Sequence, residues 1–285
     1  MRYVHVMLTG VVTALITAAI PLGWPAQAQA TGFTRHAPNG FFTGPQLALA
    51  QAIRDGDLGR VRQLAPKTDL NTPGAKHTTL LAFAVQEIVP VKNEASSPRY
   101  RIVSALLAHG ADPKARLDNG QSIAEIALRA DTPNLLRVLL DGGLDPNWRY
   151  NGDTPMIFEV AENRFLPQLA LLLEHQADVN ARDSLGKTAL FQATLLQQWD
   201  TVDYLLAHGA DPTLASELGV TYGWVLQNEL QHHIAPGSPA SVRIEQIRRK
   251  IVADGAPWPP LDPATQRAAM RARGEKVVTP AGQAQ

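Results

Sequence analysis

The stretch Leu106-Leu107-Ala108-His109-Gly110-Ala111-Asp112 decides the fold, because its pattern Leu-Leu-x-x-Gly-x-Asp recurs along the chain. The other copies cover residues 139–145, 172–178 and 205–211, so each copy begins 33 residues after the one before. In one of them the glycine is replaced by Gln176. A constant interval over four copies predicts one structural unit that is stacked on copies of itself.

Working outward from these endings, each unit has a pattern typical of two helices. In the first unit, Leu47, Ala50 and Ile53 form one apolar stripe, and Leu58, Val61 and Leu64 form a second one after a break at residues 55–57. The later units open at comparable places, which are Thr79-Leu80-Leu81-Ala82, Gly120-Gln121-Ser122, Gly152-Asp153-Thr154-Pro155, Gly186-Lys187-Thr188-Ala189 and Gly219-Val220-Thr221-Tyr222. About ten extra residues between Pro90 and Pro98 indicate an inserted loop in the second unit.

These openings and endings resemble the ankyrin-repeat family, whose units begin near Gly-x-Thr-Pro-Leu-His-x-Ala and end near Leu-Leu-x-x-Gly-Ala-Asp. The resemblance covers residues 46 to about 255. It implies an all-α fold, an ankyrin-repeat solenoid of stacked helix-turn-helix units with connecting β-turn loops. We expect about six units over residues 46–256, of which the first and the last are degenerate caps. The last one carries an insertion at 232–240 and a polar helix at 242–253.

Within the units, the sequence predicts several local features. Thr154 and Thr188 are placed to cap first helices. Gly110, Gly143 and Gly209 are expected to end second helices in the left-handed conformation. Because Gln176 stands at the equivalent position with a side chain, we expect mild strain there.

Both flanks of the array are expected to differ from it. Residues 1–30 combine Arg2, an apolar run and alternating alanines, which is typical of a secretory signal peptide cleaved after Ala28 or Ala30; a retained membrane anchor is the alternative. Residues 31–45 are predicted to be an unordered linker. Residues 257–285 are predicted to contain a short helix from Asp262 to about Arg273, followed by a disordered tail.

The amino-acid composition excludes several classes of function. The 26 basic residues equal the 26 acidic ones, so no electrostatic footprint for nucleic acid is visible. The chain has no cysteine, which excludes disulfides, thiolate catalysis and a lipid anchor on a cysteine. We therefore expect a monomeric protein in the periplasm or secreted, which touches the membrane only through its signal segment before cleavage.

The sequence does not predict catalysis or metal binding. Histidine recurs at His109, His175 and His208. A metal or proton site is one interpretation, but a donor at a helix C-terminus explains the recurrence better, because adjacent units stand roughly 10 Å apart. No nucleophile elbow, metal-binding helix or phosphate loop is present in the sequence. We expect no enzyme, no metal and no cofactor; a hydrolase or metal enzyme using these histidines is the least favoured alternative.

Binding of another protein is the expected function. In the ankyrin family the partner usually sits on the concave face, which the loops and first helices form. There the candidate binding residues are Trp148, Arg149, Tyr150, Arg182 and Asp183. Trp148-Arg149-Tyr150 is expected at an exposed loop tip, where aromatic and arginine side chains favour binding; an aromatic contact with the neighbouring loop is the alternative.

Two further positions and the role itself leave alternatives open. Glu159 replaces a usual alanine, so it is expected either to turn outward through a register shift, which we favour, or to pair with Arg149 or Arg182. The chain is similar to envelope ankyrin proteins of Gram-negative bacteria. This similarity favours an immunity-type protein that neutralises a toxin, with an accessory scaffold for a periplasmic enzyme such as a catalase as the alternative. The inserted loops near Pro90 and Pro236 are open candidates for contact with the partner.

Overall fold

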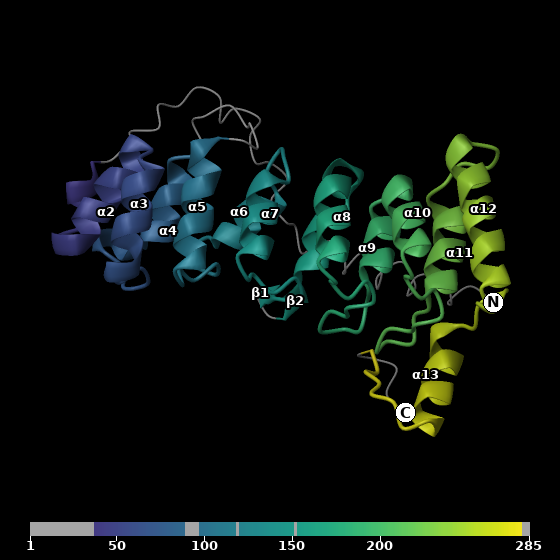
Figure 1. Ribbon diagram of the computed structural model, residues 1–285. Helices are drawn as coiled ribbons and strands as arrows, with labels where there is room; N and C mark the ends of the chain where they lie inside the picture. The colour runs from purple at the N-terminus through teal and green to yellow at the C-terminus, as the bar shows by residue number, and fades with distance from the viewer. Residues whose placement is uncertain (1–36, 89–96, 118–119, 151–152, 281–285) are drawn as a thin grey trace. The chain divides into compact units, whose positions relative to one another are not determined.

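The computed structural model describes residues 37–88, 97–117, 120–150 and 153–280. They lie in one compact unit, Ala37–Gln285 (Figure 1). Six successive pairs of helices make up most of it, and in one pair the first helix is a 3-10 helix, η4. The pairs are α2 Gly44–Asp55 with α3 Leu58–Leu64, α4 Leu80–Gln86 with α5 Pro98–Ala108, α6 Ile123–Leu128 with α7 Asn134–Asp141, η4 Met156–Val160 with α8 Leu166–Glu174, α9 Ala189–Leu195 with α10 Trp199–Ala207, and α11 Tyr222–His232 with α12 Pro239–Ala253. This confirms the predicted all-α repeat architecture.

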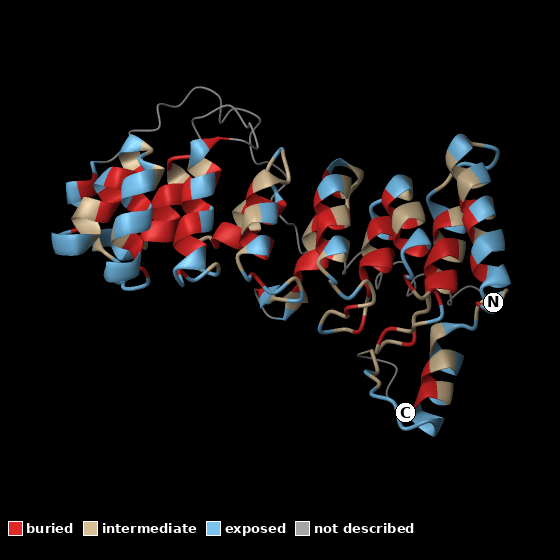
Figure 2. Cartoon of the chain, in the orientation of Figure 1, coloured by how far each residue is buried: buried red, intermediate tan, exposed pale blue. Residues whose placement is uncertain are grey.

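The pairs stack so that first helices pack against first helices and second helices against second helices. Among the second helices, α3 contacts α5, α5 contacts α7 and α7 contacts α8, while among the first helices η4 contacts α9 and α9 contacts α11. The first leucine of every Leu-Leu pair is fully buried in this stack, at Leu106, Leu139, Leu172 and Leu205. Figure 2 shows the buried residues running through the whole row of helices. A single pair would leave this surface in water, so each unit depends on its neighbours.

Hairpin-like loops connect the pairs. Strands β1 Arg149–Tyr150 and β2 Thr154–Pro155 pair antiparallel, with Tyr150 opposite Thr154. Isolated bridges link Arg116 with Ser122 and Ala215 with Thr221 at equivalent places in other units. The remaining described helices are short 3-10 turns, at Pro38–Gly40, Ala65–Lys67, Ala75–His77 and Asn163–Phe165, and the C-terminal helix α13 Pro263–Ala272.

Helix capping differs from the prediction in two units. Thr79, Ser122 and Thr221 each accept a hydrogen bond from the backbone of their own first helix, and Ser122 with Glu125 forms a full capping box. Thr154 does not cap a helix, because it lies in β2 and Pro155 precedes η4 instead. Thr188 does precede α9, but its buried hydroxyl has no hydrogen-bond partner. The predicted cap at Thr154 is therefore wrong, while Thr188 is the N-cap residue of α9 without the expected side-chain hydrogen bond.

The ends of the second helices behave as predicted. Gly110, Gly143 and Gly209 have φ angles of 89°, 96° and 90°, which lie in the left-handed region. Gln176 has φ of 67°, so the chain adopts the same turn there with a side chain present. The expected strain at this residue follows, since a Cβ disfavours the left-handed conformation.

The flanks are more ordered than predicted. Phe41 and Phe42 are buried, and the Phe42 ring lies edge-on to the Phe83 ring of α4 at 5.7 Å, so the expectation of a linker without order is wrong for residues 37–45. The predicted C-terminal helix is confirmed as α13, with Asp262 as its cap. The tail is not free as far as residue 280, because the Val278 amide donates to the Glu217 carbonyl at 2.8 Å.

The predicted signal segment and most of the loop predicted around Pro90 lie outside the described residues. Within the described part of the chain, no helix is long and apolar enough to cross a membrane.

Candidate functional site

Arginines at 33-residue spacing organise the row of loops. Arg116, Arg149 and Arg182 each donate to a carbonyl four residues ahead in their own loop. Arg149 also donates to the Arg182 carbonyl at 2.8 Å, and Arg182 donates to the Ala215 carbonyl in the next loop. Two of the predicted binding residues therefore hold adjacent loops together, although 38% of the Arg149 side chain stays exposed.

Tyr150 is not at an exposed tip, so that expectation is wrong. Only 7% of this residue is exposed, and its hydroxyl donates to the Glu159 carboxylate. Burial raises the pKa of the Tyr150 hydroxyl, and the neighbouring Glu159 charge raises it further. The tyrosine consequently stays neutral and acts as a hydrogen-bond donor inside the protein.

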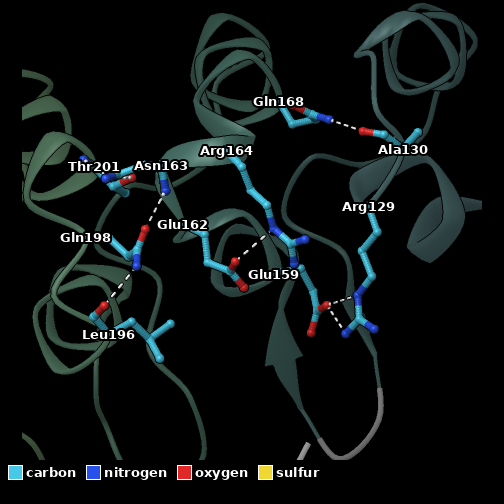
Figure 3. Close-up of polar contacts among 10 residues, drawn as sticks. All are labelled: Arg129, Ala130, Glu159, Glu162, Asn163, Arg164, Gln168, Leu196, Gln198 and Thr201. Atoms are coloured by element: carbon cyan, nitrogen blue, oxygen red, sulfur yellow. Dashed lines mark hydrogen bonds and ion pairs between the residues drawn. The ribbon is translucent and has the colours of Figure 1, made fainter. Parts of the chain in front are cut away.

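Glu159 takes a partner that the sequence reasoning did not consider. Its carboxylate accepts from the Arg129 Nε at 2.6 Å, and only 15% of its side chain is exposed (Figure 3). It therefore neither turns outward nor pairs with Arg149 or Arg182, and both predicted alternatives are wrong. The physical reason is that η4 replaces the usual α-helix in this unit, which places Glu159 between the Tyr150 hydroxyl and the end of α6.

The other two predicted binding residues also have structural partners. Trp148 is half-buried against the core, with its ring 6.3 Å from the Tyr150 ring. Asp183 accepts from the Leu185 and Lys187 amides at 2.9 and 2.8 Å and thereby shapes its own loop. Their role in binding a partner remains a prediction; Arg149 is the exposed one of the five, while Trp148, Arg182 and Asp183 are half-buried and Tyr150 is buried.

Figure 3 shows a second set of polar contacts, where the first helices α6, η4 and α9 turn into the second helices of their units. Gln168 donates to the Ala130 carbonyl at 2.7 Å and so links one unit to the unit before it. Asn163 accepts from the Thr201 hydroxyl at 3.1 Å, and the Gln198 side chain accepts from the Asn163 amide at 3.0 Å. These bonds fix the backbone at this edge of the stack.

Two adjacent leucines are exposed on this fixed edge. Leu195 and Leu196, at the end of α9, are 44% and 43% exposed. In the preceding unit, Arg164 pairs with Glu162 at 2.9 Å, and its side chain is 71% exposed. We call Leu195 and Leu196 with Glu162 and Arg164 the helix-end patch. Gln198 links the two segments, because it accepts from the Asn163 amide at 3.0 Å and donates to the Leu196 carbonyl at 2.8 Å. Exposed apolar and charged side chains on linked segments form a surface that another protein can cover.

The sequence reasoning missed these leucines, but a signal was available. The residue seven positions after the opening hydroxyl is polar in three other units, and Leu195 occupies that position after Thr188. The polar residues are Gln86 after Thr79, Arg129 after Ser122 and Asn228 after Thr221. A leucine where the repeat places polar residues is therefore an exposed leucine.

The three recurring histidines lie where the dipole interpretation places them. His109, His175 and His208 each follow the last residue of a second helix. The His208 Nδ1 lies 2.7 Å from the Tyr204 carbonyl, and the His175 Nε2 lies 3.5 Å from an Asp141 carboxylate oxygen. Among the described residues, no group of three or more potential ligands is arranged to hold a metal ion.

Comparisons with known proteins agree with this architecture. Residues 91–183 and 125–216 match the family model of ankyrin repeats in three copies. Protein PhlB of Serratia liquefaciens is 35% identical over 154 residues, which are 53% of this chain and 63% of PhlB. The mitochondrial disaggregase of Bos taurus is 33% identical over 124 residues, 42% of this chain and 18% of that protein. The chain thus spans less than two thirds of either relative.

A solved structure shows the same fold. The ankyrin repeat domain of Bcl-3, a member of the IkappaB protein family, aligns with a TM-score of 0.56 and 24% identity, over 76% of this chain and 90% of that domain. The chain therefore has an ankyrin-repeat fold, and residues 91–216 match the ankyrin-repeat model. Such repeats indicate a module for protein–protein interaction and are generally not catalytic.

Proposed function

We propose that this ankyrin-repeat protein is exported and that it binds one protein partner through the helix-end patch, with Trp148 and Arg149 as further contacts on the loops. The observation that carries the proposal is the exposed Leu195–Leu196 pair. Fully burying a leucine side chain contributes roughly 1.5 to 3 kcal/mol. Because these two are only 44% and 43% exposed, covering them adds less than half of that each, about 1 to 2.5 kcal/mol for the pair, which is the strength of one hot-spot residue.

The backbone beneath the patch supports this proposal. Asn163, Gln198 and Thr201 hold it in one conformation through the bonds of Figure 3. A surface that is already ordered loses little conformational entropy when a partner binds. Arg129 directly follows α6 in an earlier unit and is held by Glu159; 48% of its side chain is exposed.

The specific role that we propose is neutralisation of a toxin by an immunity-type protein in the periplasm. The signal-like residues 1–30 and the similarity to envelope ankyrin proteins support it, and PhlB is a relative from a bacterium. Neutralisation requires that the partner's own surface be covered, which a row of stacked units suits because it offers contact points from several repeats.

Affinity capture tests the binding surface. The chain without residues 1–30 is immobilised, exposed to envelope extract, and compared with a Leu195→Asp/Leu196→Asp variant. A Val242→Asp/Val252→Asp variant is the matched control, because those valines are 55% and 38% exposed on α12, which is not part of the patch. We expect one stoichiometric partner on the wild type and the control, and none on the leucine variant. A partner that all three retain would place the site elsewhere.

A second experiment tests the role. A strain that lacks this protein is grown with siblings that release the captured partner. Killing of the deletion strain, with rescue by the wild type and not by the leucine variant, is the expected result. Normal survival, together with loss of an enzyme activity such as catalase in the deletion strain, would overturn the immunity role in favour of an accessory scaffold and leave the binding surface standing.

A further inference from the structure

The chain folds back on itself after its last repeat. Beyond α12, a proline-rich connection leads to α13, and residues 261–280, here the C-terminal segment, run along the loop Ser216–Val220 of the last unit, here the last loop. Figure 1 shows α13 lying outside the row of paired helices, beside the loops that precede α11. The segment is therefore not a further repeat.

Three polar contacts between the C-terminal segment and the last loop run in one direction. The Arg267 Nη1 donates to the Leu218 carbonyl at 2.9 Å, and the Val278 amide donates to the Glu217 carbonyl at 2.8 Å. The Lys276 Nζ lies 2.7 Å from the Glu217 carboxylate. In each case the loop offers the acceptor and the segment offers the donor, so the loop selects a basic occupant with a free backbone amide.

The last loop is shaped for close approach by another chain. A Cβ added at Gly219 would lie 2.4 Å from the Pro263 carbonyl oxygen, so only glycine allows α13 to begin there. One unit earlier, the equivalent space is filled by the next repeat, because a Cβ at Gly186 would lie 3.0 Å from the Glu217 nitrogen. The C-terminal segment thus occupies the place that a following repeat would take.

The segment is held differently from a repeat. A repeat contributes buried leucines to a continuous core, whereas on α13 only Arg267 and Met270 are buried. Lys276 and Val278 make two of the three polar contacts. The Lys276 side chain is 75% exposed, and Val278 as a whole residue is 37% exposed. Elements with few buried apolar contacts open at a low free-energy cost compared with the core of a domain.

We propose that the last loop is a docking site for a basic chain segment and that residues 261–280 are its resident, exchangeable occupant. A partner that presents an arginine on a helix, followed by a basic extended stretch, displaces them and gains the same three contacts. This surface is separate from the helix-end patch, so the proposal stands independently of it.

The test uses a labelled synthetic peptide of residues 261–280 and the full-length protein, with binding followed by fluorescence anisotropy. In the wild type the tethered segment competes at an effective concentration in the millimolar range, so the peptide binds weakly. An Arg267→Ala/Lys276→Ala variant loosens its own segment and leaves the loop intact. We expect it to bind the peptide at least about tenfold more tightly than the wild type does.

Two controls define the outcome. Arg273→Ala is the matched variant, because Arg273 pairs with Glu275 inside the segment, and it should bind the peptide as weakly as the wild type does. A peptide carrying Arg267→Ala and Lys276→Ala should bind no protein. Equal peptide affinity for the wild type and the double variant would overturn the proposal.

Hydrogen exchange on the unaltered protein gives a test that does not depend on any variant folding. If the peptide can displace the segment, excess peptide should speed hydrogen exchange at the Val278 amide. Hydrogen exchange at the buried Leu205 amide of α10 should stay unchanged. A Val278 amide that exchanges as slowly as that of Leu205, with or without peptide, would show a permanent cap and would refute an exchangeable occupant.

Discussion

Asn180 is predicted to be a main link between the fourth and fifth repeats. Its Nδ2 donates to the Gly209 carbonyl at 3.1 Å, and its Oδ1 accepts from the Asp211 amide at 2.8 Å. Asn71 makes the same pair of bonds, to Gly110 and Asp112, at the junction between the first and second repeats. One side chain thereby satisfies two backbone groups of the following unit.

The expected cost of Asn180→Ala follows from these two bonds. Each contributes about 0.5 to 1.5 kcal/mol net, so the free energy of unfolding should fall by about 1 to 3 kcal/mol. Lys114 stands at the equivalent place of the second repeat, where its backbone amide, and not its side chain, donates to Asp112. Lys114→Ala is therefore the matched control, and it should change stability by less than about 0.5 kcal/mol.

Urea unfolding followed by far-ultraviolet circular dichroism measures both variants. The Asn180→Ala midpoint should move to lower urea with the slope unchanged, since the same surface is exposed on unfolding. Combining it with Asn71→Ala should give the sum of the two single effects, because the sites lie at different junctions. A loss for Asn180→Ala no greater than that for Lys114→Ala would refute the link.

Four further variants test other parts of the structure by the same urea assay. Glu159→Ala should cost about 2 to 3 kcal/mol, because it leaves the buried Tyr150 hydroxyl without its acceptor; a loss under about 0.5 kcal/mol would contradict that network. Burial raises the pKa of Tyr222 above its usual range, so its stabilising neutral form is fully present below about pH 10 and is lost as pH rises through the raised value. Tyr222→Phe should therefore flatten the fall in stability above about pH 10, and an unchanged fall would exclude this residue. Gln176→Gly should stabilise by about 0.5 to 1 kcal/mol by relieving its left-handed φ, whereas Gly209→Gln should destabilise.

The fold was predictable because the repeat encodes the same burial at each step. The first leucine of each Leu-Leu pair is buried and the glycines adopt the left-handed turn, so a 33-residue spacing was sufficient. The capping prediction failed at Thr154, and Thr188 lacks the expected side-chain hydrogen bond, so a threonine at the family position does not fix the local geometry. In the fourth unit a 3-10 helix starts after Pro155 in place of the expected α-helix, and the repeat spacing did not predict this change.

The candidate site was less predictable, because residue type and loop position do not say which contacts a side chain already makes. Arg149 and Tyr150 have the composition of a binding hot spot, yet one joins two loops and the other is buried against Glu159. The first use depends on the next loop, 33 residues away at the Arg182 carbonyl. The second depends on the helix that follows the Tyr150 strand, 9 residues away at Glu159. Leu195 was overlooked for the opposite reason, since a leucine in a helix is normally read as core.

What distinguishes the two cases is comparison between repeats at the same position. Arginine recurs at 116, 149 and 182, and the recurrence marks a bond that the stack itself needs, since each one closes its own loop. Leu195 does not recur, because the same position is polar in three other units. In a stack held together by repeated contacts, a side chain that departs from the repeat and remains exposed does not serve stacking, and this argument makes Leu195 a stronger binding candidate than Arg149.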